Sequence, residues 1–95
     1  MSFAPLDPVL HSQLRLAVMS LLMAVDEGDF TFLLERTGAT RGNLSVQITK
    51  LKEAGYITVK KTFKENYPNT LCRTTPKGVK AFEEYVRSIK GYLGK

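Results

Sequence analysis

Apolar and polar residues alternate with a helical period through the N-terminal part of the chain. Between Leu10 and Val25 apolar side chains recur every three or four positions, which is the pattern of a helix with one broad apolar stripe. Asp7 and Pro8 stand at its start, where the carboxylate can accept from free backbone N–H groups and proline has no N–H to leave unpaired. The pattern therefore predicts a first helix over residues 7–25.

Two shorter helices are expected next, over residues 29–37 and 40–54. Each begins at a side chain that can cap free N–H groups and is followed by a glycine, the residue that most readily adopts the left-handed conformation at a helix end. In the second of them, Leu44, Ile48 and Leu51 recur at spacings of four and three and mark the buried face. Because the connection between the two helices is so short, they must cross at a steep angle, which predicts a helix-turn-helix.

After residue 55 the period becomes two, since β-branched and aromatic residues alternate with polar ones. This predicts a β-hairpin over residues 56–74, with an extended loop at 64–70 and a short second strand at 71–74. Thr75 and Pro76 repeat the helix-start signal and predict a last helix over residues 75–93. The apolar seam of that helix consists of Val79, Phe82, Val86, Ile89 and Leu93.

These elements predict a mainly α fold with a small β-hairpin, an α+β class with the order α-α-α-β-β-α and room for a short extra strand after the first helix. At 95 residues the chain is expected to form one domain, residues 1–95. Its net charge of +5 is uneven, because residues 1–40 have a balance of −3 and residues 41–95 a balance of +8. The basic part is expected to face a polyanion, and charge alone does not distinguish nucleic acid from an acidic membrane surface.

Composition excludes several classes of protein. One cysteine, Cys72, allows no disulfide within the chain, and the longest charge-free apolar run, residues 16–25, is shorter than the ~18 residues of a membrane span. We therefore expect a cytoplasmic protein. His11 and Cys72 form no catalytic or metal-binding constellation, so we expect no enzyme, metal or cofactor. His11 is expected to be a capped or packed residue of the first helix and Cys72 a small buried apolar residue, with a redox role for the thiol as the lesser alternative.

Five short motifs carry a family resemblance. They are Asp-Pro-Val-Leu-His at 7–11, Gly-Asn-Leu-Ser at 42–45, Leu-Lys-Glu-Ala-Gly-Tyr-Ile at 51–57, Lys-Thr-Phe at 61–63 and Thr-Pro-Lys-Gly at 75–78. In this order the chain resembles the winged helix-turn-helix transcriptional regulators of bacteria and archaea, close to the MarR-like and ArsR-like repressors. The resemblance implies a homodimer that binds double-stranded DNA sequence-specifically, with the third helix in the major groove and the hairpin, or wing, on the backbone or minor groove.

The third helix and the wing supply the candidate DNA contacts. With the buried face of the helix turned inward, the outward residues are Thr40, Arg41, Asn43, Ser45, Val46, Gln47, Thr49 and Lys50. Gln47 and Asn43 are the favoured base readers, because a side-chain amide can pair with N6 and N7 of adenine. On the wing the candidates are Lys60, Lys61, Lys64 and Arg73, whose expected role is to bind the backbone. The alternative is that these side chains form only a solvated surface.

The chain departs from the family pattern at three places. Val46 stands where a basic residue is common, and Asn66, Tyr67 and Asn69 occupy the wing tip where relatives often have arginines. Val46 offers contact with a thymine methyl group instead. Thr74 replaces the leucine that usually precedes the Thr-Pro start of the last helix, which leaves the packing of that junction open.

The candidate dimer interface combines the apolar surplus of the first helix with the seam of the last one. Its residues are Leu10, Leu14, Leu16, Met19, Val79, Phe82, Val86, Ile89 and Leu93. The alternative is that these residues belong entirely to the core. A small-molecule effector is a further partner that the resemblance implies, whereas no membrane partner is expected. The alternative function is a winged-helix module that docks a protein and does not read DNA.

Overall fold

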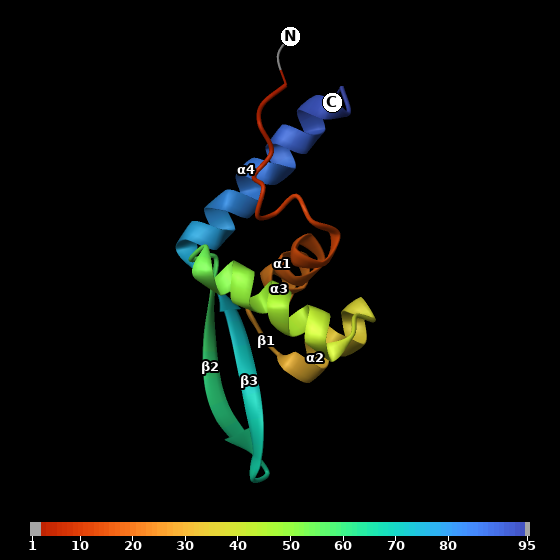
Figure 1. Cartoon of the computed structure of the whole chain (residues 1–95). Helices are drawn as coiled ribbons and strands as arrows, with labels where there is room; N and C mark the ends of the chain where they lie inside the picture. The colour runs from red at the N-terminus through yellow and green to blue at the C-terminus, as the bar shows by residue number, and fades with distance from the viewer. Residues whose placement is uncertain (1–2, 95) are drawn as a thin grey trace.

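The computed structural model describes residues 3–94, which form four helices and three strands (Figure 1). In chain order they are α1 (Gln13–Val25), β1 (Glu27–Asp29), α2 (Phe30–Thr37), α3 (Arg41–Glu53), β2 (Ile57–Lys64), β3 (Tyr67–Thr74) and α4 (Pro76–Tyr92). The predicted fold class is confirmed, including the short extra strand after the first helix. Met1, Ser2 and Lys95, which the expected domain of residues 1–95 includes, lie outside the described residues.

The first helix begins later than predicted. Oδ1 of Asp7 accepts from the backbone N–H of Val9 at 2.8 Å and the backbone of Asp7 accepts from His11 at 2.8 Å, so the Asp-Pro start forms a single turn. Ser12 then has an extended backbone, with φ −152° and ψ 127°, and the helix begins at Gln13. The predicted span of 7–25 is therefore wrong over its first six residues, because the turn capped by Asp7 ends at the extended Ser12 and does not run on into the helix.

The hairpin turns more tightly than predicted. Glu65 and Asn66 both have positive φ, 53° and 67°, which is the backbone of a two-residue turn that matches the twist of the flanking strands. The predicted extended loop at residues 64–70 is therefore wrong, since Tyr67–Thr74 is a strand paired with β2. Pro68 of β3 pairs with Phe63 of β2. Strand β1 pairs only with residues 71–73 of β3, so the N–H that Pro68 lacks is not needed for pairing with β1.

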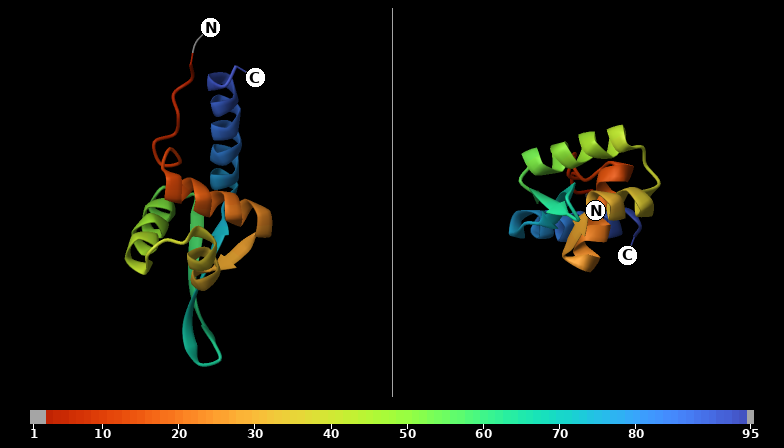
Figure 2. Two further views of the ribbon diagram at one scale, coloured as in Figure 1. Left: turned by 90° about the vertical axis from the view of Figure 1, so that its right-hand side faces the viewer. Right: turned by 90° about the horizontal axis from the view of Figure 1, so that it is seen from below.

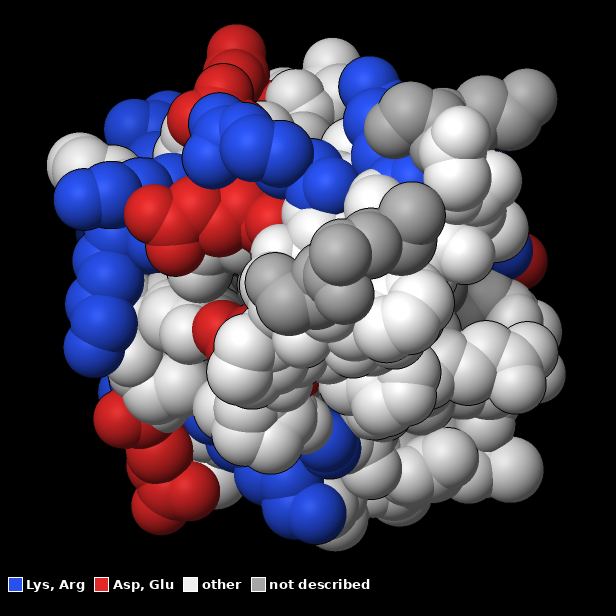
Figure 3. All heavy atoms as spheres, turned by 90° about the horizontal axis from the view of Figure 1, so that it is seen from above, with Lys and Arg blue, Asp and Glu red and all other residues white. Residues whose placement is uncertain are grey.

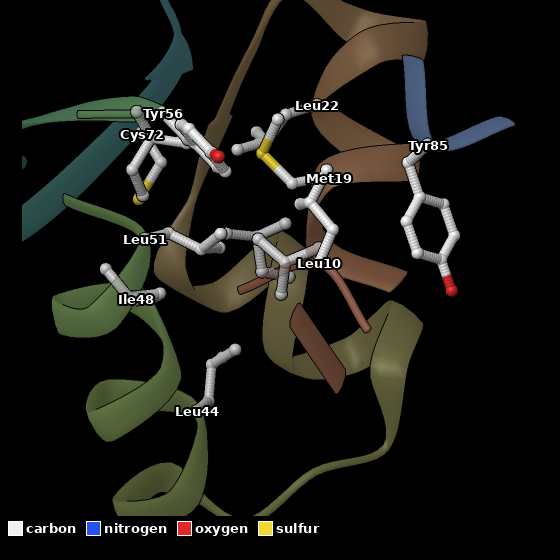
Figure 4. Close-up of a cluster of buried hydrophobic side chains, with 12 residues drawn as sticks. Leu10, Met19, Leu22, Leu44, Ile48, Leu51, Tyr56, Cys72 and Tyr85 are labelled. Atoms are coloured by element: carbon white, nitrogen blue, oxygen red, sulfur yellow. The ribbon is translucent and has the colours of Figure 1, made fainter. Parts of the chain in front are cut away.

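The core lies between α1, the other two short helices and one face of the sheet, whose strand order is β1-β3-β2 (Figure 4). Its fully buried members are Leu10, Val18, Met19, Leu22, Leu33, Leu44, Leu51 and Cys72. The longer α4 leaves this body and projects away from it, beside the N-terminal segment (Figure 2). The molecule is consequently elongated, 55 × 25 × 21 Å, with the wing at one end and α4 at the other.

The junction between the wing and α4 depends on close backbone packing. Thr75 caps α4 by accepting from the N–H of Gly78 at 3.0 Å, and its own N–H donates to the carbonyl of Tyr56 at 3.0 Å. A Cβ on Gly78 would lie 2.1 Å from that carbonyl oxygen, so only glycine fits there. Thr74 is half-buried and pairs with Ile57. The contacts of Thr75 and Gly78 with the backbone therefore determine the packing at this junction, which the sequence alone did not predict.

The residues predicted for a dimer interface occupy three environments. Leu10 and Met19 are fully buried in the core of the protomer, so the prediction is wrong for these two: their side chains are already covered. Half-buried positions that pack on the core are Leu14, Leu16, Phe82 and Ile89, and Val79 is half-buried as well. Val86 and Leu93 are exposed, Leu93 by 66%. The exposed members of the predicted interface are therefore on α4 and at its C-cap.

Candidate nucleic-acid interface

Helix α3 presents one face to the core and the other to solvent. The hydroxyl of Thr40 caps it by accepting from the N–H of Asn43 at 3.2 Å, and Leu44, Ile48 and Leu51 are buried as predicted. The exposed candidates on α3 and at its cap are Thr40, Arg41, Asn43, Ser45, Val46, Thr49 and Lys50. The left view of Figure 2 shows α3 on one side of the molecule, with the hairpin projecting beyond it. An unobstructed helix face of this kind can enter the major groove of DNA.

The helix stands between two hollows. One, of about 320 Å³, lies between α3 and the sheet and is lined by Phe30, Ser45, Ile48, Thr49, Lys52, Val59, Lys61 and Thr70. The other, of about 410 Å³, lies towards α1 and α2 and is lined by Ser12, Gln13, Leu14, Ala17, Thr37, Ala39, Asn43 and Gln47. The outward residues of α3 therefore form a ridge, with hydroxyls on its wing side and amides on its α1 side.

Gln47 is held on both ends of its side-chain amide. Its Oε1 accepts from Nη1 of Arg15, and its Nε2 donates to Oδ1 of Asn43 at 3.0 Å. Arg15 in turn donates from Nε to the carbonyl of Val9 at 2.6 Å. The two predicted base readers, Asn43 and Gln47, thus belong to one hydrogen-bonded chain. Sequence reasoning missed Arg15; the available signal was a single cation in an otherwise uncharged helix.

The predicted wing cations lie on opposite faces of the sheet. Lys61 lines the hollow beside α3 and donates to the hydroxyl of Thr70 at 3.2 Å. Lys60 and Arg73 line a hollow on the other face, together with Glu27. Nη2 of Arg73 lies 2.9 Å from Oε2 of Glu27, which is its cross-strand neighbour. A carboxylate therefore lies beside Arg73 at the base of the wing and offsets the charge of this candidate.

The tip of the wing combines one cation with two exposed aromatic rings. Lys64 and Tyr67 are paired across the hairpin beside the turn, and Phe63 is the next residue towards the base. Phe63 is 78% exposed and Tyr67 75%. Lys64 is the predicted wing candidate nearest the turn, and it is exposed.

The two other residues with reactive or metal-binding side chains, Cys72 and His11, have structural roles. Cys72 is fully buried as expected, and burial raises the pKa of its thiol to about 11, so the reactive thiolate is scarce at neutral pH. His11 precedes α1 instead of lying in it, and its Nδ1 forms a hydrogen bond with the hydroxyl of Tyr85 at 3.0 Å. Among residues 3–94 no group of three His, Cys, Asp or Glu side chains is placed to hold a metal ion. Within the same residues no helix has both the length and the apolar character to span a bilayer.

A family model described as a winged helix DNA-binding domain matches residues 14–93. The chain belongs to this family. The winged helix domain is also 31% identical, over 81 residues, to an uncharacterised protein of Methanocaldococcus jannaschii, with 85% of this chain and 88% of that protein covered. The resemblance to winged helix-turn-helix DNA-binding domains is thereby confirmed.

Solved structures show the same fold. A transcriptional regulator homologue from Pyrococcus horikoshii superposes with a TM-score of 0.84 at 23% identity, covering 90% of this winged helix domain and 85% of that chain. The regulator BldR from Sulfolobus solfataricus has a TM-score of 0.73 at 17% identity, covering 86% and 58%. NadR, solved in complex with 4-hydroxyphenylacetate, has a TM-score of 0.73 at 20% identity, covering 92% and 64%.

Proposed function

We propose that this winged helix domain is a homodimeric transcriptional regulator that reads double-stranded DNA, with α3 in the major groove and the wing on the backbone or minor groove. The observation that carries the proposal is the ridge of α3, where amide, hydroxyl and cationic side chains face solvent between two hollows. The amides of the exposed Asn43 and the half-buried Gln47 are suited to base edges, and the neighbouring cations are suited to phosphates. The proposed activity is binding, without catalysis.

Each group has its own part in the proposed complex. Gln47 and Asn43 read adenine, and Val46, which is 51% exposed, meets a thymine methyl group. Arg41 and Lys50 bind phosphate or guanine, and the hydroxyls of Thr40, Ser45 and Thr49 add polar contacts. Lys61 and Lys64 bind the backbone on the α3 side and at the tip of the wing; Lys60 lies on the opposite face and makes at most a secondary contact.

Binding to DNA is tested with fragments of the source genome in an electrophoretic or fluorescence anisotropy assay at low salt. Retention of a subset of fragments against excess non-specific DNA is expected for a sequence-reading domain. Absence of binding at low salt contradicts the proposal and favours the alternative, a winged-helix module that docks a protein.

Two substitutions separate reading from positioning. Gln47→Ala is expected to lower discrimination at one base pair by about 5- to 150-fold, because a bidentate contact contributes roughly 1–3 kcal/mol of selectivity. Lys61→Ala is expected to weaken binding to all sequences alike, because a phosphate contact carries no base information. Anisotropy titrations on a set of single-base operator variants measure both. Equal losses across all sequences for Gln47→Ala would show that this residue is not a reader.

The exposed seam of α4 is the proposed dimer surface. Val86 of α4 and Leu93 at the C-cap of this helix are exposed, on the element that projects from the body, and Figure 3 shows a wide area without charged side chains on the face of the molecule seen from above. A two-fold dimer formed there would place two copies of α3 in successive major grooves, about 34 Å apart or a multiple of that.

The double variant Val86→Glu/Leu93→Glu is expected to be a folded monomer where the native chain is a dimer, because two carboxylates per protomer would face each other across an apolar contact. Size-exclusion chromatography with light scattering measures the mass. Lys80→Glu introduces the same group at an exposed position of α4 away from the seam and serves as the control. A native chain that is monomeric at all concentrations removes the two-half-site proposal.

A small-molecule effector is part of the proposal only as a competitor of DNA. The hollow of about 320 Å³ beside α3 lies within the range of small-ligand sites, and Lys61 on its rim is also a proposed backbone contact. NadR, a neighbour in fold, has been solved with a small aromatic acid. An occupant of this hollow would therefore weaken DNA binding.

A further inference from the structure

Arg15 joins three parts of the molecule at one guanidinium group. Its Nε donates to the carbonyl of Val9 at 2.6 Å, its Nη2 to the carbonyl of Pro8 at 3.5 Å, and its Nη1 to Oε1 of Gln47. The side chain is half-buried between α1, the turn before it and α3. Since a guanidinium is planar and keeps its charge, this arrangement fixes the positions of all three acceptors relative to one another.

These contacts determine which way the amide of Gln47 points. The cation requires the oxygen on the Arg15 side, so the nitrogen lies on the Asn43 side and donates to Oδ1 at 3.0 Å. A carboxamide has two acceptor lone pairs and two N–H groups, so one lone pair and one N–H remain free. One acceptor and one donor are what the N6 and N7 edge of adenine needs. The network therefore leaves Gln47 competent to read and already ordered.

We propose that Arg15 is the positioning residue that sets the reading orientation of Gln47 and links it to the segment before α1. The segment is itself anchored, because Asp7 caps its turn and accepts from the hydroxyl of Tyr56 at the start of the wing. Ordering the amide before DNA arrives reduces the conformational entropy lost on binding. This inference rests on the proposed function and adds a residue that does not itself touch the bases.

Arg15→Lys is the decisive variant, because it keeps the charge and removes the planar fork that serves three acceptors. A binding site is first selected from random-sequence DNA with the native full chain. The ratio of affinities for that site and for the site with its Gln47-dependent base pair exchanged is then measured. Arg15→Lys is expected to lower this ratio at least about fivefold, towards the value for Gln47→Ala. Arg36→Lys, the same change at an exposed position of α2, is expected to leave it unchanged.

The double variant distinguishes positioning from a separate contact. If Arg15 acts through Gln47, Arg15→Lys has little further effect on the ratio in a Gln47→Ala background, so the two effects do not multiply. Multiplying effects, or an unchanged ratio in Arg15→Lys alone, overturn the inference. Thermal unfolding of each variant accompanies the titrations, so that a loss of folded protein is separated from a loss of selectivity.

A measurement without DNA keeps the inference apart from the proposed function. In the free native chain, the side-chain NH₂ resonances of Gln47 in a ¹⁵N-correlated NMR spectrum should shift in Arg15→Lys and not in Arg36→Lys. Unshifted resonances overturn the inference even if the chain binds DNA. Shifted resonances in a chain that binds no DNA leave the contact standing and contradict the proposed function.

Discussion

Replacing Gly78 with alanine is expected to lower the free energy of unfolding by at least about 3 kcal/mol. A Cβ at this position would lie 2.1 Å from the carbonyl oxygen, 2.8 Å from the carbonyl carbon and 2.9 Å from the Cα of Tyr56. These are backbone atoms, so no side-chain rotation relieves the overlap. The first turn of α4 must move away from the wing, and the hydrogen bond from Thr75 to the same carbonyl is lost. Urea unfolding followed by circular dichroism measures the change.

Gly91→Ala in the same helix is the matched control. A Cβ there meets no atom within 4 Å, so alanine adds no overlap and is expected to stabilise the helix by about 0.5–1 kcal/mol. The same substitution, glycine to alanine, is therefore expected to lower the free energy of unfolding at Gly78 and to raise it at Gly91. Equal unfolding midpoints for Gly78→Ala and the native chain would contradict the close packing described for this junction.

Hydrophobic period and capping residues are enough to predict most of the elements. Asp29, Thr40 and Thr75 each accept a backbone N–H at the helix start where the sequence places them. The two wrong boundaries have local causes in the backbone conformation, which the hydrophobic period does not reveal. Ser12 is extended, which separates the Asp7 turn from α1, and the left-handed backbone of Asn66 and its neighbour shortens the predicted loop to two residues.

The site is less predictable than the fold, because its geometry depends on register and on helix crossing. Lys60 and Lys61 are adjacent in sequence, yet the alternation of a strand places them on opposite faces. Arg73 meets Glu27 only because β1 pairs with β3 in one register. Arg15 and Gln47 are 32 positions apart, and only the packing of α1 on α3 brings them together. The outward residues of α3 can be predicted from its buried face, whereas the residues that they contact on other elements cannot.

The affinity of the proposed dimer for DNA is expected to fall by about 10⁴-fold between 50 and 200 mM monovalent salt. Arg41, Lys50, Lys61 and Lys64 are exposed on the α3 side or at the tip of the wing, and two protomers would place about eight of these cations on phosphates. Release of the condensed counterions then gives a slope of about −7 in a plot of log affinity against log salt. Anisotropy titrations at several salt concentrations measure this slope.

Substitution of single cations tests where the wing meets DNA. In the proposed dimer, Lys64→Gln would remove two phosphate contacts and is expected to make the slope shallower by about 2. Arg73→Gln removes the same charge, but this cation is paired with Glu27 at 2.9 Å on the face away from α3, so the slope is expected to stay unchanged. Equal effects of the two substitutions would mean that the base of the wing at Arg73 also lies on DNA. A native chain whose affinity is independent of salt would instead fit a protein-docking surface, because counterion release accompanies every phosphate contact.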